Sequence, residues 1–301
     1  MRTSKAPYAV MLAVGLAMLV VATAPDLSGR QASGAVQVDD DDIGGVVSGP
    51  SGPEAGVWVI AETSDLPTRF VKIVVTDGQG RYALPDLPDA TYDVWVRGYG
   101  LVDSAKVRSA PGRTLNLTAV VAPNERAAAQ YYPAGYWYSL IEVPGRSEFP
   151  GTGPDGNGIS PEVESQAAWI RSLKSGGCTA CHSMGNKATR EILPELGEFD
   201  SLVAAWDRRI QSGQAGGSMT AGLNRIGRRR ALEMFADWTD RIVAGEVPEA
   251  PPRPRGIERN VVISSWDWAD PKAYLHDEIS TDKRDPTVNA NGPIYGALEA
   301  S

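Results

Sequence analysis

The stretch "TYDVWVRG" (Thr91–Gly98) indicates the fold class of the first half of the chain. Apolar or aromatic side chains occupy every second position, with Tyr92, Val94 and Val96 set against Asp93, Trp95 and Arg97. Successive side chains of a strand point to opposite faces, so this alternation predicts a half-buried antiparallel strand.

Similar short runs precede and follow this strand over residues 43–123. They are rich in β-branched and aromatic residues, which favour strands, and are "GVWVIAE" (56–62), "FVKIVVT" (70–76), "RYALPDL" (81–87) and "TLNLTAVVA" (114–122). Turn formers separate them at "DGQG" (77–80) and "PDLPDA" (85–90). We therefore expect an all-β antiparallel sandwich over residues 43–123.

Two quoted stretches carry a family resemblance. "GGVVSGPSGPEAGVWVIAE" and "TDGQGRYALPDLPDATYDVWVRGYG" resemble the carboxypeptidase-regulatory-like, transthyretin-like sandwich domains. Such folds are also similar to starch-binding-type sandwiches, which implies a carbohydrate-binding-like docking module. On that reading Trp58, Trp95 and Tyr99 would stack on a sugar, and the alternative is that they pack in a core or an interface.

The second half changes to a helical pattern. Residues 124–159 form a connector with the aromatic cluster "YYPAGYWYSLIEVP" (131–144), which we expect to seal an interface between two modules. Apolar residues then recur at helical spacing, which predicts helices over about 160–173, 200–211 and 228–244. The fold class expected is therefore multidomain, with a C-terminal all-α domain over residues 160–248.

The last segment, residues 249–301, is predicted to be a linker and an irregular tail. It opens with the stiff proline-rich "EAPPRPRG" and contains one strand-like run, "NVVISSW". Its many turn formers do not suggest an independent core.

The only two cysteines of the chain lie in "CTACH", which is Cys178 to His182. This spacing is the attachment signature of c-type haem. Each cysteine forms a thioether with one vinyl group, and two intervening residues let both sulfurs reach one edge of the porphyrin. His182 then supplies the proximal iron ligand, so the sequence predicts one covalent haem c.

Two other uses of the motif remain open. The pair Cys178 and Cys181 would also suit a disulfide or a dithiol redox site, although such sites favour a strand-to-helix context. A zinc site needs four convergent ligands, and beyond the motif only the distant His276 adds a histidine.

The sixth iron position determines what a haem does. A methionine there favours electron transfer, whereas an open position permits ligand binding. Met184 follows His182 too closely to reach the opposite face, and Met234 lies in an apolar helical pattern. Met219, in the glycine-rich "SGQAGGSMTAGL", is expected in a loop and is the distal ligand that we predict. His276 is the weaker alternative.

Residues 160–248 therefore resemble a small monohaem cytochrome c domain, with "CTACH" after a first helix and "RRRALEMFADWTDRIVAGE" as the last helix. Arg225 and the trio 228–230 form a dense basic patch. The patch is expected to face haem propionates or an acidic redox partner, or to be a solvated helix start.

Composition and the N-terminus restrict compartment and partners. The chain of 301 residues carries a net charge of −8, which argues against nucleic acid as a partner. Arg2 and Lys5 precede a short apolar run over 9–21, which predicts a secretory signal within residues 1–35 and a periplasmic or otherwise exported protein. An uncleaved membrane anchor is the alternative. The acidic run Asp39–Asp42 reads as an exposed linker, with calcium binding as the less favoured reading.

The predicted function is that of an exported cytochrome c that transfers electrons to a partner protein. It is more an electron carrier than a complete enzyme, because no nucleophile–base pair is visible. The tail from "VVISSWDWADPKAYLHDEIS" onward also resembles the lead-in to a streptogramin-lyase-like β-propeller. The alternative function is therefore an electron-relay part of a larger propeller-containing oxidoreductase or lyase-like enzyme.

Overall fold

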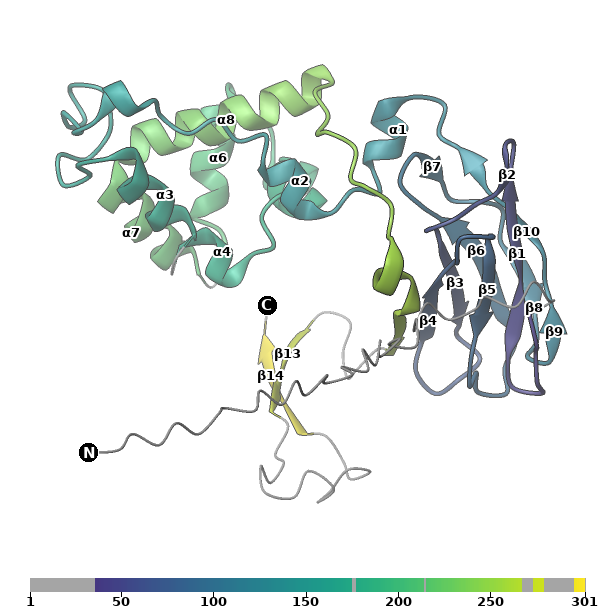
Figure 1. The fold of residues 1–301 in the computed structure, drawn as a ribbon. Helices are drawn as coiled ribbons and strands as arrows, with labels where there is room; N and C mark the ends of the chain where they lie inside the picture. The colour runs from purple at the N-terminus through teal and green to yellow at the C-terminus, as the bar shows by residue number, and fades with distance from the viewer. Residues whose placement is uncertain (1–35, 175–176, 214, 267–272, 279–294, 301) are drawn as a thin grey trace, which may run out of the picture. The chain divides into compact units, whose positions relative to one another are not determined.

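The computed structural model of the chain describes residues 36–174, 177–213, 215–266, 273–278 and 295–300. For the last two segments and for Cys181 it describes the backbone only. The expected order, strands in the N-terminal part and helices after them, is confirmed (Figure 1). The secretory signal expected within residues 1–35 lies outside the described residues.

One five-stranded antiparallel sheet forms the first layer of a β-sandwich-like region. Its strand order is β12-β4-β3-β6-β8. The bounds are β3 Trp58–Thr63, β4 Phe70–Val75, β6 Tyr92–Arg97, β8 Val107–Ser109 and β12 Val262–Trp266.

The second layer is built around β1 (Ile43–Gly49). It pairs antiparallel with β2 and β5 and parallel with β9 and β10. Strands β7 and β11 form a separate two-stranded antiparallel sheet. The remaining bounds are β2 Gly52–Pro53, β5 Arg81–Leu84, β7 Leu101–Val102, β9 Arg113–Thr114, β10 Leu117–Thr118 and β11 Val120–Val121. The expectation of a wholly antiparallel sandwich is therefore wrong at β1, because the chain crosses over before it returns beside that strand.

The two layers enclose an aliphatic core. Tyr92, Val94 and Val96 all point into it from β6, as their alternation predicts. Gly45 of β1 accommodates the crossing chain, because a Cβ there would run into the carbonyl of Leu115.

The tail is more regular than expected. The run predicted as strand-like forms β12, which completes the first sheet by pairing with β4, from Val262 opposite Val74 to Trp266 opposite Phe70. Two further strands, β13 (Ala273–Glu278) and β14 (Tyr295–Ala300), pair antiparallel with each other. The C-terminal part of the chain is thus not all-α.

Helices occupy most of the chain between the sandwich strands β11 and β12. Their bounds are α1 Glu125–Ala129, α2 Ala134–Tyr138, α3 Gln166–Lys174, α4 Cys178–Cys181, α5 Lys187–Arg190, α6 Leu202–Ile210, α7 Gly216–Ile226 and α8 Arg228–Ala244, with 3₁₀ turns η1 Arg146–Glu148, η2 Pro194–Leu196 and η3 Gly256–Asn260. Helices α6 and α8 pack together (Figure 1). Among the described residues, no helix is long and apolar enough to cross a membrane.

These helices share one core rich in tryptophan. Trp137, Trp169, Trp206 and Trp238 are all buried in it. Trp137 comes from the segment that we expected to be a connector, so residues 124–159 add helices and buried side chains to this core. Helix α8 ends as predicted, with Gly245 in the left-handed conformation that favours glycine.

Two helical boundaries differ from the prediction. The first helix begins at Gln166 rather than near Ser160, because Ser160 and Pro161 lie in a turn and Ser165 Oγ accepts the N–H of Ala168. The glycine-rich segment around Met219, expected to be a loop, is helix α7.

Candidate functional site

The motif "CTACH" forms one helical turn and its exit. Helix α4 spans Cys178–Cys181, and the N–H of His182 donates to the carbonyl of Cys178 over 3.0 Å. Positions three residues apart share a face of a helix, so the two cysteine positions lie on one side. His182 leaves the helix in an extended conformation, and its side chain is exposed.

Two contacts tie α4 to the end of α3. The hydroxyl of Thr179 donates to the carbonyl of Lys174. Gly177 caps α4, and a Cβ at this position would run into the carbonyl of Ser172. Only glycine therefore allows the chain to pass this closely from α3 into the motif.

The residues after His182 are fixed against α2. The N–H of Met184 donates to the carbonyl of His182 over 2.9 Å, and the Met184 side chain is buried in the helical core. Gly185 has φ +94, and a Cβ there would clash with the backbone of Ala134 and Tyr138. A side chain at position 185 would therefore force the backbone after the motif, or α2, to shift.

One buried arginine and one half-buried arginine hold the next turn by its carbonyls. Arg190 donates to the carbonyl of Gly185 over 2.8 Å, and its guanidinium lies 3.9 Å from the ring centre of Trp137. Arg209 of α6 donates to the carbonyl of Glu191 over 2.6 Å. Burial lowers the pKa of both guanidiniums, because the charged form loses hydration.

An apolar cavity of about 260 Å³ lies next to the motif. Helix α2, helix α3 and the chain after α2 line it, with Gly135, Tyr138, Ser139, Ile141, Val143, Ile170, Leu173 and Lys174. Pockets that enclose small ligands are typically ~300–1,000 Å³. This cavity is therefore smaller than the pockets that enclose a whole small ligand.

Tyr138 connects the cavity to the motif. Burial and then the nearby Cys178 raise the pKa of Tyr138 to about 12. Its ring also meets Trp238 edge-on, with the ring centres 6.3 Å apart. A group joined to Cys178 would therefore find an apolar and aromatic wall beside it.

The motif offers one imidazole and two cysteine positions on one helical face, beside an apolar wall. Among the described side chains, which do not include those of Cys181 and His276, three or more metal-binding groups converge only at Asp39, Asp41 and Asp42. A structural zinc site needs four such ligands. The groups present at the motif fit the attachment signature of a thioether-linked haem.

The predicted distal ligand lies in a helix. Met219 of α7 is half-buried and packs on the edge of the helical core, and α7 contacts α3. Met234 is buried in that core with 1% of its surface exposed, as its helical pattern suggests. His276 lies in β13, and its side chain is outside the described part of the chain.

The basic patch is largely paired. Arg228 lies 2.7 Å from Asp207, Arg229 3.1 Å from Glu233 and Arg230 3.0 Å from Glu148. Only Arg225 of the four is exposed without an ion pair among the described residues. Two of these ion pairs connect α8 to α6 and to η1, so the trio has little unpaired charge at the surface.

The three aromatic residues considered for sugar stacking contact protein groups. Trp95 is 6% exposed, and the ammonium of Lys106 lies 4.3 Å from its ring centre. Trp58 and Tyr99 meet edge-on, with ring centres 4.8 Å apart. Lys106 would have to move before a sugar reached the face of Trp95 that it covers.

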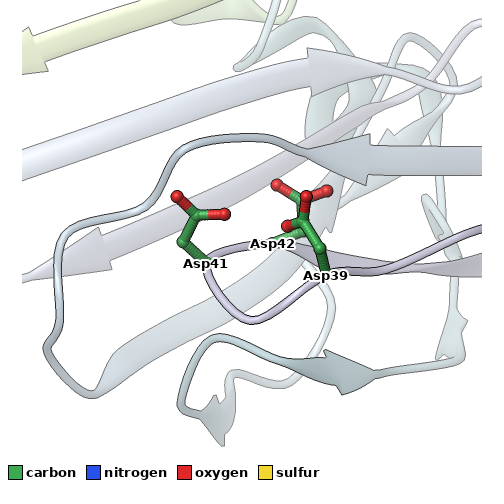
Figure 2. Close-up of side chains that lie close together, drawn as sticks. All are labelled: Asp39, Asp41 and Asp42. Atoms are coloured by element: carbon green, nitrogen blue, oxygen red, sulfur yellow. The ribbon is translucent and has the colours of Figure 1, made fainter.

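The acidic run forms a turn before β1. Figure 2 shows the carboxylates of Asp39, Asp41 and Asp42, whose oxygens lie within 4.8 Å of one another. Hydrogen bonds within the chain account for this turn, because Asp42 Oδ1 accepts the N–H of Asp86 and the Asp41 carbonyl accepts that of Leu87. We assign no ion to these side chains.

Sequence reasoning missed the wall of the cavity. Tyr138, Ile141 and Val143 belong to the aromatic segment that we expected between two modules, yet they line the site. The signal available was the density of aromatic residues there, which does not say what the rings face.

No protein-family model and no curated protein matches this chain.

Proposed function

We propose that the helical part of this protein binds one covalent haem c and transfers electrons as a cytochrome c. The observation that carries the proposal is helix α4, which sets the Cys178 and Cys181 positions on one face, with His182 next and an apolar wall beside Cys178. The bound haem would supply one-electron chemistry at its iron.

The chain's own residues have distinct roles in this proposal. Cys178 and Cys181 form the two thioethers, and His182 is the proximal ligand. Met219 is the distal ligand. Tyr138 and the apolar side chains around it make one edge of the site apolar, and the polarity around a haem is one of the factors that set its reduction potential.

The remaining assignments follow from the sequence. An exported, periplasmic location agrees with the apolar run after Arg2 and Lys5. The sandwich serves as a docking module, for a carbohydrate or for another protein, and the electron partner is a protein.

The test is expression of the full chain in a host that attaches c-type haem. We expect a haem that stays with the protein through acid–acetone extraction and shows the spectrum of a thioether-linked haem. The Cys178→Ala, Cys181→Ala double variant should lose it. A wild-type chain that releases all its haem, or takes up none, contradicts the proposal.

The distal ligand needs a separate experiment. Met219→Leu should abolish the far-red methionine-to-iron absorption band of the oxidised protein, whereas Met234→Leu and Met184→Leu should retain it. A band that survives in Met219→Leu would assign the ligand elsewhere. Extraction of each variant confirms that covalent haem is still present.

A further inference from the structure

Strand β12 forms an open edge of the first sheet of the sandwich. Among the described strands it pairs with β4 alone, and β8 forms the opposite edge. Alternate residues of an edge strand direct their backbone N–H and C=O groups away from the sheet. The outward groups of β12 have no hydrogen-bond partner within the described part of the chain. Such a row of donors and acceptors is a template for the backbone of another strand.

The two edges of this sheet differ in the features that prevent pairing with another chain. Strand β8 has three residues, one of them Arg108, and Lys106 and Pro111 flank it closely. Short length, lysine or other charge, and proline all protect an edge. The run "NVVISSW" (260–266), which contains β12, has no charged residue, no glycine and no proline. The β12 edge therefore lacks the protection that the β8 edge has.

The large side chains of β12 are apolar and stay exposed. Val262, Ile263 and Trp266 are 50%, 46% and 49% exposed. Val262 lies opposite Val74, which is buried in the sandwich core. Because opposite residues of a ladder share a face of the sheet, Val262 and Trp266 continue the inner face past the edge of that core. The inner face of β12 is thus apolar surface that another strand would cover.

The sequence of β12 is self-complementary. When two copies pair antiparallel about Ser264, Trp266 of each copy lies opposite Val262 of the other on the inner face. Ile263 of each copy lies opposite Ser265 of the other on the outer face. Each large side chain thus meets a smaller one, and an aromatic residue opposite a β-branched one stabilises a sheet. This register also keeps the inner faces of both sheets on the same side, since opposite residues share a face.

We propose that β12 is a self-association surface, at which a second copy of this chain adds its own β12 and joins the two sheets into one. The occupant is another β12 because the strand is uncharged and matches itself. The whole chain has a net charge of −8, which makes copies repel, and an uncharged strand is where two copies meet with least repulsion. None of the β12 residues belongs to the candidate haem site, so the proposal does not depend on the proposed function.

The test measures the molar mass of the full chain by sedimentation equilibrium. A single strand on each side makes a small interface, and small interfaces belong to weak complexes. We therefore expect a mass near one chain at about 1 μM that rises towards two chains at about 500 μM. Association should be stronger at about 0.15 M than at about 0.01 M ionic strength, because salt screens the repulsion between two acidic copies.

Substitutions at the two-fold axis test the register. Ser264→Glu places two carboxylates opposite each other in the dimer, and Ser264→Lys places two ammonium groups there. Like charges directly opposite destabilise a sheet, so each variant alone should associate about fivefold more weakly than wild type. A 1:1 mixture of the two should associate at least as strongly as wild type, because a carboxylate then meets an ammonium group. The matched control is Ser109→Glu at the β8 edge, which should behave as wild type.

Several outcomes overturn the proposal. A wild-type chain that keeps the mass of one chain at the highest concentration does so, and so does equal weakening by Ser264→Glu and Ser109→Glu, which would mean that only net charge matters. A mixture without recovery rejects the pairing about Ser264. Trp266→Ser adds no charge and removes both pairs with Val262, so it should weaken association about fivefold. An unchanged dissociation constant for Trp266→Ser, with thermal unfolding like that of wild type, would place the interface elsewhere.

Discussion

The two hydrophobic cores of this protein differ in how completely their buried polar groups are hydrogen-bonded. The sandwich core is aliphatic, and its two buried tyrosines have partners, with Tyr82 donating to the Leu115 carbonyl over 2.6 Å and Tyr92 to the Pro88 carbonyl over 2.8 Å. The helical core is aromatic and encloses a guanidinium, that of Arg190.

The helical core also contains buried hydrogen-bond donors that have no acceptor among the described residues. The indole N–H of Trp169 and Nε of Arg190 are buried with no hydrogen-bond partner among the described residues. In the sandwich the same holds for the indole N–H of Trp95, which lies outside the aliphatic core. An apolar cavity lies beside helices α2 and α3. A buried donor without an acceptor is unfavourable, so the comparison teaches that two of these three donors belong to the helical region and one to the outer face of the sandwich.

The largest expected effect comes from Trp238→Ala in the helical core. Trp238 is fully buried, donates to the carbonyl of Trp137 over 2.9 Å and contacts the ring of Tyr138. We expect a loss of about 3–5 kcal/mol in the free energy of unfolding. Hydrogen exchange should show lost protection in α6 and α8 and retained protection in β3 and β6.

The reverse variant sharpens this comparison. Val94→Ala opens a gap in the sandwich core and should lower protection in β3 and β6 while α8 stays protected. Equal loss of protection in both regions, in either variant, would show that the two cores unfold as one unit.

A pair of glycine variants compares backbone constraints in the two regions. Gly185 and Gly100 both have positive φ, at +94 and +81. An added Cβ at Gly185 meets the backbone of α2, whereas at Gly100 it meets open space. We expect Gly185→Ala to cost about 3 kcal/mol and Gly100→Ala about 1 kcal/mol in urea unfolding. Equal costs would show that the contact with α2 adds nothing to the conformational strain.

The features of the fold that the sequence predicted correctly are those set by local patterns. Alternation fixes the faces of β6, where Tyr92 and Val94 point inward, and helical spacing with Gly245 locates the end of α8. Both patterns are local. In each, the residues that pack inward recur at the period of the element itself.

The failures involve contacts distant in sequence. Helix α7 contains several glycines, which lower helix propensity, yet Leu223 and Ile226 bury one face of it and tertiary packing prevails. The pairing of β12 with β4 depends on an open sheet edge formed almost two hundred residues earlier, as Val262 opposite Val74 shows. The motif itself was visible, but the side chains that form its cavity were not.

A smaller effect is expected where η1 meets α8. Arg230 donates both to Glu148 Oε2, over 3.0 Å, and to Oε1, over 3.1 Å. The guanidinium of Arg230, and then the N–H of Gly145, hold the pKa of Glu148 below its ordinary 4.5. Such a group stabilises the fold fully above that value, and the contribution is lost as the pH falls from there through the folded pKa.

Glu148→Gln tests this contribution. We expect a loss of about 1 kcal/mol at pH 7, since the pair is partly solvated, and a smaller difference from wild type near pH 3. Unfolding by urea at the two pH values measures it. The matched control is Glu233→Gln, which removes the more exposed partner of Arg229 and should change stability less. A difference that stays constant with pH would contradict the role given to ionised Glu148.

The smallest effect is expected on the outer face of the sandwich, at Lys106→Met. The ammonium lies over Trp95 and 3.1 Å from Glu62 Oε2, with about half of its side chain exposed. Methionine retains the apolar cover of the ring but removes the charge, so we expect a loss of about 0.5 kcal/mol. Lys106→Ala should in addition expose the indole, seen as stronger acrylamide quenching of Trp95 fluorescence against a Trp95→Phe reference. If Lys106→Ala leaves quenching unchanged, Lys106 does not cover Trp95 in solution.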